Sequence, residues 1–277
     1  MRVAVIGCGS IGTRHARNLK ALGHWVSAFD TDAEKAFRLA VQCHGDPKQA
    51  AFCPTDNWRM FGPRDQFDAV FICTPASTHA AVASELLEVG YVGPLYVEKP
   101  LAMSVEEAEI FRVWPHPVVM VGYNWRWNRD LLEFREQSGS IEFLHFVCAT
   151  RIADWPGRAY GDPLLECSHE IDLVRWWLGE FDVEMAGGRS GGFFLQSRDA
   201  VVDLWWNVAP PRRLFSAKNT RGLSRTLIPS PASIDDSYRS AIREFLCCVA
   251  SRRVPSCTVA DGIAVLNTVA RARELAA

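Results

Sequence analysis

The sequence predicts an α/β protein with a doubly wound parallel sheet over residues 1–122 and an α+β part with an open, mainly antiparallel sheet over residues 123–277. Three observations support this prediction. In the first part, short apolar runs alternate with helix-compatible segments, as in sheets buried on both faces. A glycine-rich turn follows the first run. After Gly122, several strand-like segments follow one another without long connections, which favours antiparallel pairing.

The expected elements follow from this alternation and from the turn residues between them. In the first part, strands are expected at 2–6, 25–29, 50–53, 68–73, 94–98 and 117–121, and helices at 11–22, 32–42, 76–89 and 104–113. In the second part, helices are expected at 128–137, 164–178 (ended by Gly179), 234–251 and 259–273, and strands at 141–150, 182–188, 192–197, 200–208, 212–218 and 224–228. The last helix is expected to pack back on the first part.

The turn after the first strand has the pattern GxGxxG, and each glycine has a physical reason. Gly7 suits a tight turn, Gly9 allows the backbone to approach a pyrophosphate, and Gly12 allows the helix to pack closely on the strand. Ser10 and Ile11 begin the helix, whose N-terminal N–H groups and positive dipole end favour phosphates. The pattern predicts a Rossmann-type dinucleotide site.

Asp30 ends the second strand, 18 residues after Gly12. An acid at this position can accept a hydrogen bond from a ribose 2′-hydroxyl and repel a 2′-phosphate, so NAD is expected as cofactor and NADP is disfavoured. The alternative is that Asp30 caps the helix that starts near Thr31 or Asp32.

Two further motifs lie at carboxyl ends of strands, where open α/β sheets bind ligands. Thr74, Pro75 and His79 follow the fourth strand, and Glu98 and Lys99 follow the fifth. All five are expected beside the cofactor, and Lys99 is expected to touch the substrate as well, since a lysine there can orient a reacting hydroxyl. The alternatives are a strand end with a Ser77 helix cap, and a solvated surface lysine.

The predicted helix at 164–178 carries Glu166, His169 and Asp172 on one stripe of an otherwise apolar surface. Ionisable groups are costly to bury, so the stripe suggests catalysis by His169 and Glu166. A hydrogen-bonded core histidine is the alternative. Metal binding is disfavoured, because no second cluster has ligand spacing. The substrate side is assigned to Tyr123, Asn124, Arg126, Arg158, Tyr160 and Asp172, together with Lys99 and His169.

Bulk properties exclude several classes of protein. The net charge of −2 comes without a basic stripe, which argues against nucleic-acid binding. No long uncharged apolar run suggests a membrane span, and the chain opens directly with a strand, without room for a signal peptide. The nine cysteines form no CxxC pair, as expected of free thiols in the cytoplasm.

These motifs, in this order, resemble those of the Gfo/Idh/MocA oxidoreductases, which include glucose–fructose oxidoreductase and inositol dehydrogenase. The resemblance rests on GCGSIG, Asp30, CTPASTHA, EKP, GYNWRW and LLECSHEIDLVRWWLG, and it extends to the closing segment from Asp236. It implies an NAD-dependent oxidoreductase in which Lys99 and His169 act on a sugar hydroxyl. Inositol dehydrogenases have an acid where this chain has Leu165. This chain has its acid, Glu166, one position later, and in this respect it resembles the branch that acts on nucleotide-linked sugars.

The expected reaction is hydride transfer between NAD and a secondary alcohol or ketone of a sugar, with His169 taking the hydroxyl proton and Lys99 polarising the oxygen. Family members usually run longer, and because Tyr160–Pro163 leads almost directly into the helix, a substrate-facing loop is expected to be missing here. Two alternatives therefore stay open. One is a non-catalytic NAD-binding regulator or partner subunit, and the other is a reductase of a non-sugar substrate.

A homodimer or homotetramer is expected through the outer face of the antiparallel sheet. In the strand at 201–208, one side (Val202, Leu204, Trp206 and Val208) is wholly apolar and suits the core. The other side (Val201, Asp203, Trp205 and Asn207) is mixed, as interfaces often are. The strand at 143–150 has apolar residues on both sides, and relatives that resemble the chain associate through this face. The alternative is a monomer in which Trp205 lies under the C-terminal tail.

Overall fold

The computed structural model of the 277-residue chain describes residues 1–45, 52–54, 67–149, 163–189, 191–205 and 212–277. They divide into two compact units. The first comprises Met1–Gly122 and Tyr238–Ala260, and the second comprises Tyr123–Ser237 and Asp261–Ala277.

The first unit is built on a parallel six-stranded sheet with the order β3-β2-β1-β4-β5-β6. Its strands are β1 (Arg2–Ile6), β2 (Trp25–Asp30), β3 (Phe52–Pro54), β4 (Ala69–Ile72), β5 (Leu95–Val97) and β6 (Val119–Val121). β1 lies at the centre, and its residues from Val3 to Ile6 are fully buried. Since both faces of this sheet are covered, its strands are apolar throughout, and the predicted doubly wound sheet is confirmed.

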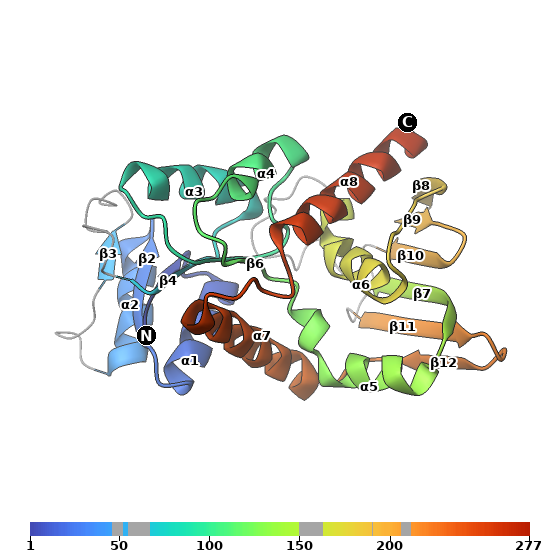
Figure 1. Cartoon of the computed structure of the whole chain (residues 1–277), viewed down its shortest axis with the longest axis horizontal. Coiled ribbons are helices and arrows are strands. Elements are labelled where there is room, and N and C mark those ends of the chain that lie inside the picture. The colour runs from blue at the N-terminus through green and yellow to red at the C-terminus, as the bar shows by residue number, and fades with distance from the viewer. Residues whose placement is uncertain (46–51, 55–66, 150–162, 190, 206–211) are drawn as a thin grey trace. The chain divides into compact units, whose positions relative to one another are not determined.

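Four helices follow strands of this sheet, and they lie in two contacting pairs. The pairs are α1 (Ser10–Ala21) with α2 (Ala33–His44), and α3 (His79–Glu88) with α4 (Val105–Arg112). Figure 1 shows α3 and α4 side by side along the sheet. Side chains cap two of them: Asp32 accepts the N–H groups of Glu34 and Lys35 at α2, and Ser104 accepts that of Glu107 at α4.

The second unit contains a six-stranded sheet with the order β12-β11-β7-β10-β9-β8. Its strands are β7 (Ile141–Ala149), β8 (Met185–Arg189), β9 (Gly192–Gln196), β10 (Ala200–Trp205), β11 (Arg212–Asn219) and β12 (Ser224–Leu227). β7 and β10 run parallel, whereas the other neighbouring pairs are antiparallel, so the mainly antiparallel sheet is confirmed.

Two helices of the second unit accompany the sheet, α5 (Arg129–Ser138) and α6 (Ser168–Leu178). One face of the sheet, called the inner face here, packs against α6: Phe146 of β7 meets Trp177 of α6 edge-on, with 5.5 Å between the ring centroids. Val202 and Leu204, predicted to face inward, are fully buried. Asp203, on the predicted outer side of the same strand, is only 6% exposed, and its Oδ2 lies 2.8 Å from Nε2 of His145. Trp206, Asn207 and Val208 lie outside the described residues.

Two helix predictions need correction. The segment predicted as one helix from about 164 is a short 3-10 helix, Pro163–Cys167, followed by α6 from Ser168, so Glu166 precedes the α-helix. Gly179 ends α6 with φ +99°, as expected of a C-cap. The first unit also takes most of α7 (Pro231–Ser251) rather than the last helix, α8 (Val259–Ala276), whose residues from Asp261 belong to the second unit.

The aromatic core explains why α7 takes that place. Phe245 of α7 meets Phe71 of β4 and Tyr96 of β5 at ring-centroid distances of 5.3 and 5.5 Å. All three side chains are fully buried. These large rings give α7 an apolar stripe that matches the sheet of the first unit.

Candidate functional site

The glycine turn between β1 and α1 contains two glycines that packing requires and one that it does not. Gly7 has φ +93°, and a Cβ there would lie 2.7 Å from the backbone of Cys73; a Cβ on Gly12 would lie 1.7 Å from the carbonyl oxygen of Gly7. Gly9 has no other atom within 4 Å of its ideal Cβ position. Packing therefore requires Gly7 and Gly12, whereas Gly9 leaves an open cradle at the N-terminus of α1. An NAD pyrophosphate fits such a cradle.

The carboxylate of Asp30 braces this turn. Its Oδ2 accepts the backbone N–H of Cys8 at 2.6 Å, and its Oδ1 accepts that of Asp32 at 2.9 Å. The N-cap of α2 is Asp32 rather than Asp30. Because a carboxylate has about four acceptor positions, these two bonds leave capacity for a ribose hydroxyl.

The turn after β4 is held by buried contacts. Thr74 is half-buried and Pro75 is exposed, so both are accessible to a ligand. His79 is fully buried, with Nε2 2.9 Å from the carbonyl oxygen of Thr74 and Nδ1 3.1 Å from that of Pro100. Burial lowers the pKa of His79, and the neighbouring carbonyl oxygens act in the opposite direction. Its ring nitrogens are engaged by the backbone, so direct binding of the cofactor by His79 is disfavoured.

Glu98 and Lys99 follow β5. Glu98 is 7% exposed, with Oε1 2.6 Å from Nε2 of the buried His15, and its Oε2 accepts the backbone N–H of Lys99 at 3.1 Å. A Cβ on Gly122 would lie 3.0 Å from Glu98 Oε1, so a glycine at the end of β6 makes room for this carboxylate. Lys99 itself is half-buried.

In the second unit, His169 lies in the first turn of α6 between aromatic rings. It is 5% exposed, with ring-centroid distances of 5.5 Å to Trp125 and 5.9 Å to Tyr123. Tyr123 is fully buried. Asn124 is 1% exposed and donates to Ser237 Oγ at 2.6 Å. Tyr123 and Asn124 thus contribute to the core of this unit.

Arg126 and Asp172, both assigned to the substrate from the sequence, instead form an internal ion pair. The Arg126 guanidinium donates to both carboxylate oxygens of Asp172, at 2.6 and 2.8 Å, and to Asp261 at 2.9 Å. Arg126 is 5% exposed and Asp172 is 1% exposed. Burial raises the pKa of Asp172 to about 6, while the bonds from Arg126 lower it. The pair joins the start of the unit to α6 and α8, which is a structural role. Arg158 and Tyr160 lie outside the described residues.

Arg213, on β11, was not identified from the sequence. It lies 3.0 Å from Glu166 and 3.0 Å from the fully buried Glu170, and its guanidinium lies 6.0 Å from the ring centroid of Trp125. It therefore neutralises the two acids that flank His169 on α6 and in the preceding turn. Nothing in the alternation of β11 distinguishes this arginine from the neighbouring Arg212.

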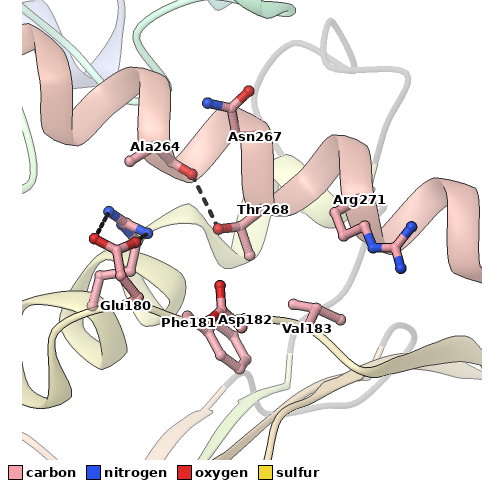
Figure 2. A pocket seen from close by; sticks show the side chains of 9 residues that line it. Glu180, Phe181, Asp182, Val183, Ala264, Asn267, Thr268 and Arg271 are labelled. Atoms are coloured by element: carbon pink, nitrogen blue, oxygen red, sulfur yellow. Dashed lines mark hydrogen bonds and ion pairs between the residues drawn. The ribbon is translucent and has the colours of Figure 1, made fainter.

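A cavity of about 500 Å³ lies elsewhere in the second unit, between α8 and the segment after α6 (Figure 2). Arg175 and Glu180 form an ion pair at its edge, and Thr268 donates to the carbonyl oxygen of Ala264. The other lining residues are Phe181, Asp182, Val183, Asn267 and Arg271. No predicted site residue lines it, so we do not assign it to the reaction.

The described residues contain no group of three or more His, Cys, Asp or Glu placed to hold a metal ion. In the same part of the chain, no helix is long and apolar enough to cross a membrane.

Comparison with known proteins agrees with this architecture. Residues 1–112 match the Gfo/Idh/MocA family, described as an oxidoreductase family with an NAD-binding Rossmann fold. The UDP-N-acetylglucosamine 3-dehydrogenase of Acidithiobacillus ferrooxidans is 28% identical over 193 residues, which cover 67% of this chain and 56% of that protein. Inositol 2-dehydrogenase 2 of Saccharopolyspora erythraea is 32% identical over 196 residues, which cover 65% and 54%.

The chain therefore spans about half the length of the curated relatives it matches. Among solved structures, a myo-inositol dehydrogenase from Corynebacterium glutamicum superposes with a TM-score of 0.82. That match covers 100% of this chain and 96% of the other at 18% identity, so it supports the fold.

Proposed function

We propose that this chain, which belongs through its NAD-binding residues 1–112 to the Gfo/Idh/MocA oxidoreductases, is an NAD-dependent dehydrogenase of a sugar or nucleotide-linked sugar. The observation that carries the proposal is the position of Lys99. It is half-buried at the carboxyl end of β5, in the same unit as the open Gly9 cradle, and its backbone is bound by Glu98. Such a position suits a group that acts on a substrate next to the cofactor.

The reaction needs a group that moves a proton and a group that orients the oxygen. We assign the first role to His169, whose imidazole takes the hydroxyl proton, and the second to Lys99, whose ammonium group polarises the oxygen. NAD, when bound, supplies the hydride acceptor. Glu166 is salt-bridged to Arg213, which supports an electrostatic role beside His169 rather than proton transfer.

The cofactor-binding residues are proposed from the same geometry. Gly7, Gly9 and Gly12 with Ser10 and Ile11 form the phosphate cradle, and Asp30 approaches the ribose. Thr74 and Pro75 border the nicotinamide. For His79 and Glu98, the contacts support a role in holding the loops rather than touching NAD.

For the substrate, two features favour a nucleotide-linked sugar over a free polyol: the resemblance of the Leu165–Glu166 sequence to the branch that acts on such sugars, and the similarity to a UDP-N-acetylglucosamine dehydrogenase. Arg126 no longer supports an anionic substrate, because its charge is neutralised internally.

A substrate panel tests the proposal. The purified protein is assayed with NAD or NADP and with UDP-N-acetylglucosamine, other nucleotide sugars, myo-inositol and glucose, and reduced nicotinamide is followed by absorbance. We expect turnover with NAD rather than NADP, because Asp30 repels a 2′-phosphate. We also expect a higher kcat/KM for a nucleotide sugar than for a free polyol. Turnover of polyols alone would reverse the substrate assignment. Tight NAD binding without turnover of any sugar or ketone would favour a regulator.

We also propose that the chain acts in the cytoplasm. The cysteines whose environment the structure describes are free thiols: Cys8, Cys43, Cys73, Cys148, Cys167, Cys247, Cys248 and Cys257. All of them except Cys247 are buried. Free thiols are typical of a reducing compartment.

Assembly through the outer sheet face is a separate proposal. Val201 and Trp205 on this face are half-buried, so they offer apolar area to a second copy. Light scattering should give a mass above the 30.9 kDa of one chain. Trp205→Glu should reduce the mass to that of the monomer. Val113→Glu, at a 73% exposed position in the first unit, is the matched control and should not change it. A wild-type monomer would refute the proposal.

A further inference from the structure

Two fully buried histidines hold the chain on either side of Lys99. On the N-terminal side, Nε2 of His15 lies 2.6 Å from Oε1 of Glu98, and Oε2 of the same carboxylate accepts the backbone N–H of Lys99 at 3.1 Å. One carboxylate thus connects α1 to the peptide that carries the lysine.

The ring of His15 is itself fixed in place. The aromatic rings of Phe71, Tyr96 and Tyr238 surround it at centroid distances of 5.1–5.5 Å. A buried imidazole packed among three rings has little freedom to move, so Glu98 is held by a rigid partner.

On the C-terminal side, His79 at the start of α3 holds the next two residues. Its Nδ1 lies 3.1 Å from the carbonyl oxygen of Pro100 and 3.3 Å from that of Leu101. Its Nε2 lies 2.9 Å from the carbonyl oxygen of Thr74. One ring therefore joins the turn after β4 to the loop after β5.

The need for such support follows from the chemistry of lysine. Its ammonium group stands at the end of four rotatable bonds, so its location depends on a fixed backbone. Here Glu98 before the lysine and Pro100 and Leu101 after it are buried, while Lys99 itself is half-buried. The backbone on both sides is anchored, and the side chain remains accessible.

We propose that His15 and His79 are positioning residues for Lys99: by binding Glu98 on one side and the Pro100–Leu101 carbonyl groups on the other, they set where its ammonium group meets the substrate. This inference rests on the proposed catalytic role of Lys99. It concerns residues that touch neither substrate nor hydride and that act on Lys99 through the EKP peptide, although His79 also holds the turn at Thr74.

The test compares His15→Leu and His79→Leu with His15→Gln and His79→Gln, which keep a side-chain NH₂ donor group. His44→Leu is the matched control, because His44 also bonds a backbone carbonyl, that of Val26 at 2.7 Å, but belongs to α2. Each variant is measured for kcat, KM for the substrate, NAD affinity by fluorescence, and Tm.

We expect the leucine variants to lower kcat by about tenfold or more, since a displacement of about 1 Å at a reacting group has effects of this size, while NAD affinity changes less than about threefold. The glutamine variants should recover part of the loss. His44→Leu should lower Tm without lowering kcat. Unchanged kcat in both leucine variants would overturn the proposal. Equal losses of kcat and NAD affinity without rescue by glutamine would make both histidines merely structural and would overturn it too.

A spectroscopic measurement covers the case in which a leucine variant does not fold. The chain has five lysines, so an NMR spectrum of labelled methyl groups attached to the lysine amines contains few signals. The Lys99 signal is assigned as the one that is lost in Lys99→Arg. The Lys99 signal should shift in the glutamine variants and stay in place in His44→Leu. An unchanged signal would contradict positioning. If Lys99→Ala keeps full activity, the proposed function fails; if it is inactive while both leucine variants are fully active, only this inference fails.

Discussion

Replacing Lys99 or His169 by alanine is expected to lower kcat by on the order of 10²–10⁴, the range for loss of a general acid–base group. Lys99 is half-buried at the carboxyl end of β5, in the same unit as the Gly9 cradle, and His169 is 5% exposed between two aromatic rings. NAD affinity should change little, because the cradle is built from other residues. Steady-state kinetics with the best sugar of the panel, together with an NAD titration, measure both quantities.

Two controls make this result interpretable. Lys20→Ala removes an exposed lysine at the end of α1 and should leave kcat unchanged. Glu166→Gln should have a smaller effect than His169→Ala, since Glu166 is held in a salt bridge with Arg213. If the alanine variants lose NAD affinity in the same proportion as kcat, Lys99 and His169 have structural rather than catalytic roles.

Alanine at Gly9 and alanine at Gly12 are expected to damage the protein in different ways. Gly9 has φ −69° and open space around its Cβ position, so Gly9→Ala should fold with an unchanged Tm. Its new methyl group occupies the cradle, and NAD affinity should fall by about tenfold or more, the effect of losing close approach to the pyrophosphate.

Gly12→Ala has no such space. Its Cβ would lie 1.7 Å from the carbonyl oxygen of Gly7, so α1 must move away from the turn. The free energy of unfolding should fall by about 1–3 kcal/mol or more, as for overpacked sites. Thermal unfolding without cofactor separates the two variants. A stable Gly9→Ala protein that binds NAD as tightly as the wild type would refute the assignment of the cradle.

The sequence predicted the first unit well because its signals are local. A strand buried on both faces needs a continuous apolar run, and the turns between elements need glycine, proline or capping residues at fixed places. Gly7, Gly12 and Gly179 all occupy positions that the pattern required. The helix start near residue 164 was less accurate, since Pro163–Cys167 has helical spacing but forms only a 3-10 helix.

The roles of the charged side chains could not be predicted in the same way, because their partners are distant in the sequence. From the sequence, Arg126 looked like an anion-binding residue, but its partners Asp172 and Asp261 lie 46 and 135 positions away along the chain. Arg213 similarly pairs with Glu166 at a separation of 47 residues, and His15 with Glu98 at 83. No periodicity connects such residues, so the sequence cannot distinguish a charge that awaits a substrate from one already neutralised inside the fold.

By itself, the sequence determined the order of strands and helices, the glycine-rich turn after β1 and the motifs that contain Lys99 and His169, because all of these depend on residues within one or two turns of each other. The tertiary structure alone decided which buried charges are paired, which helix carries Phe245 to the first sheet, and that His15 and His79 flank the lysine. Those outcomes depend on the shape of the packed core and on the cost of burying an unpaired charge, which arise only when distant segments meet.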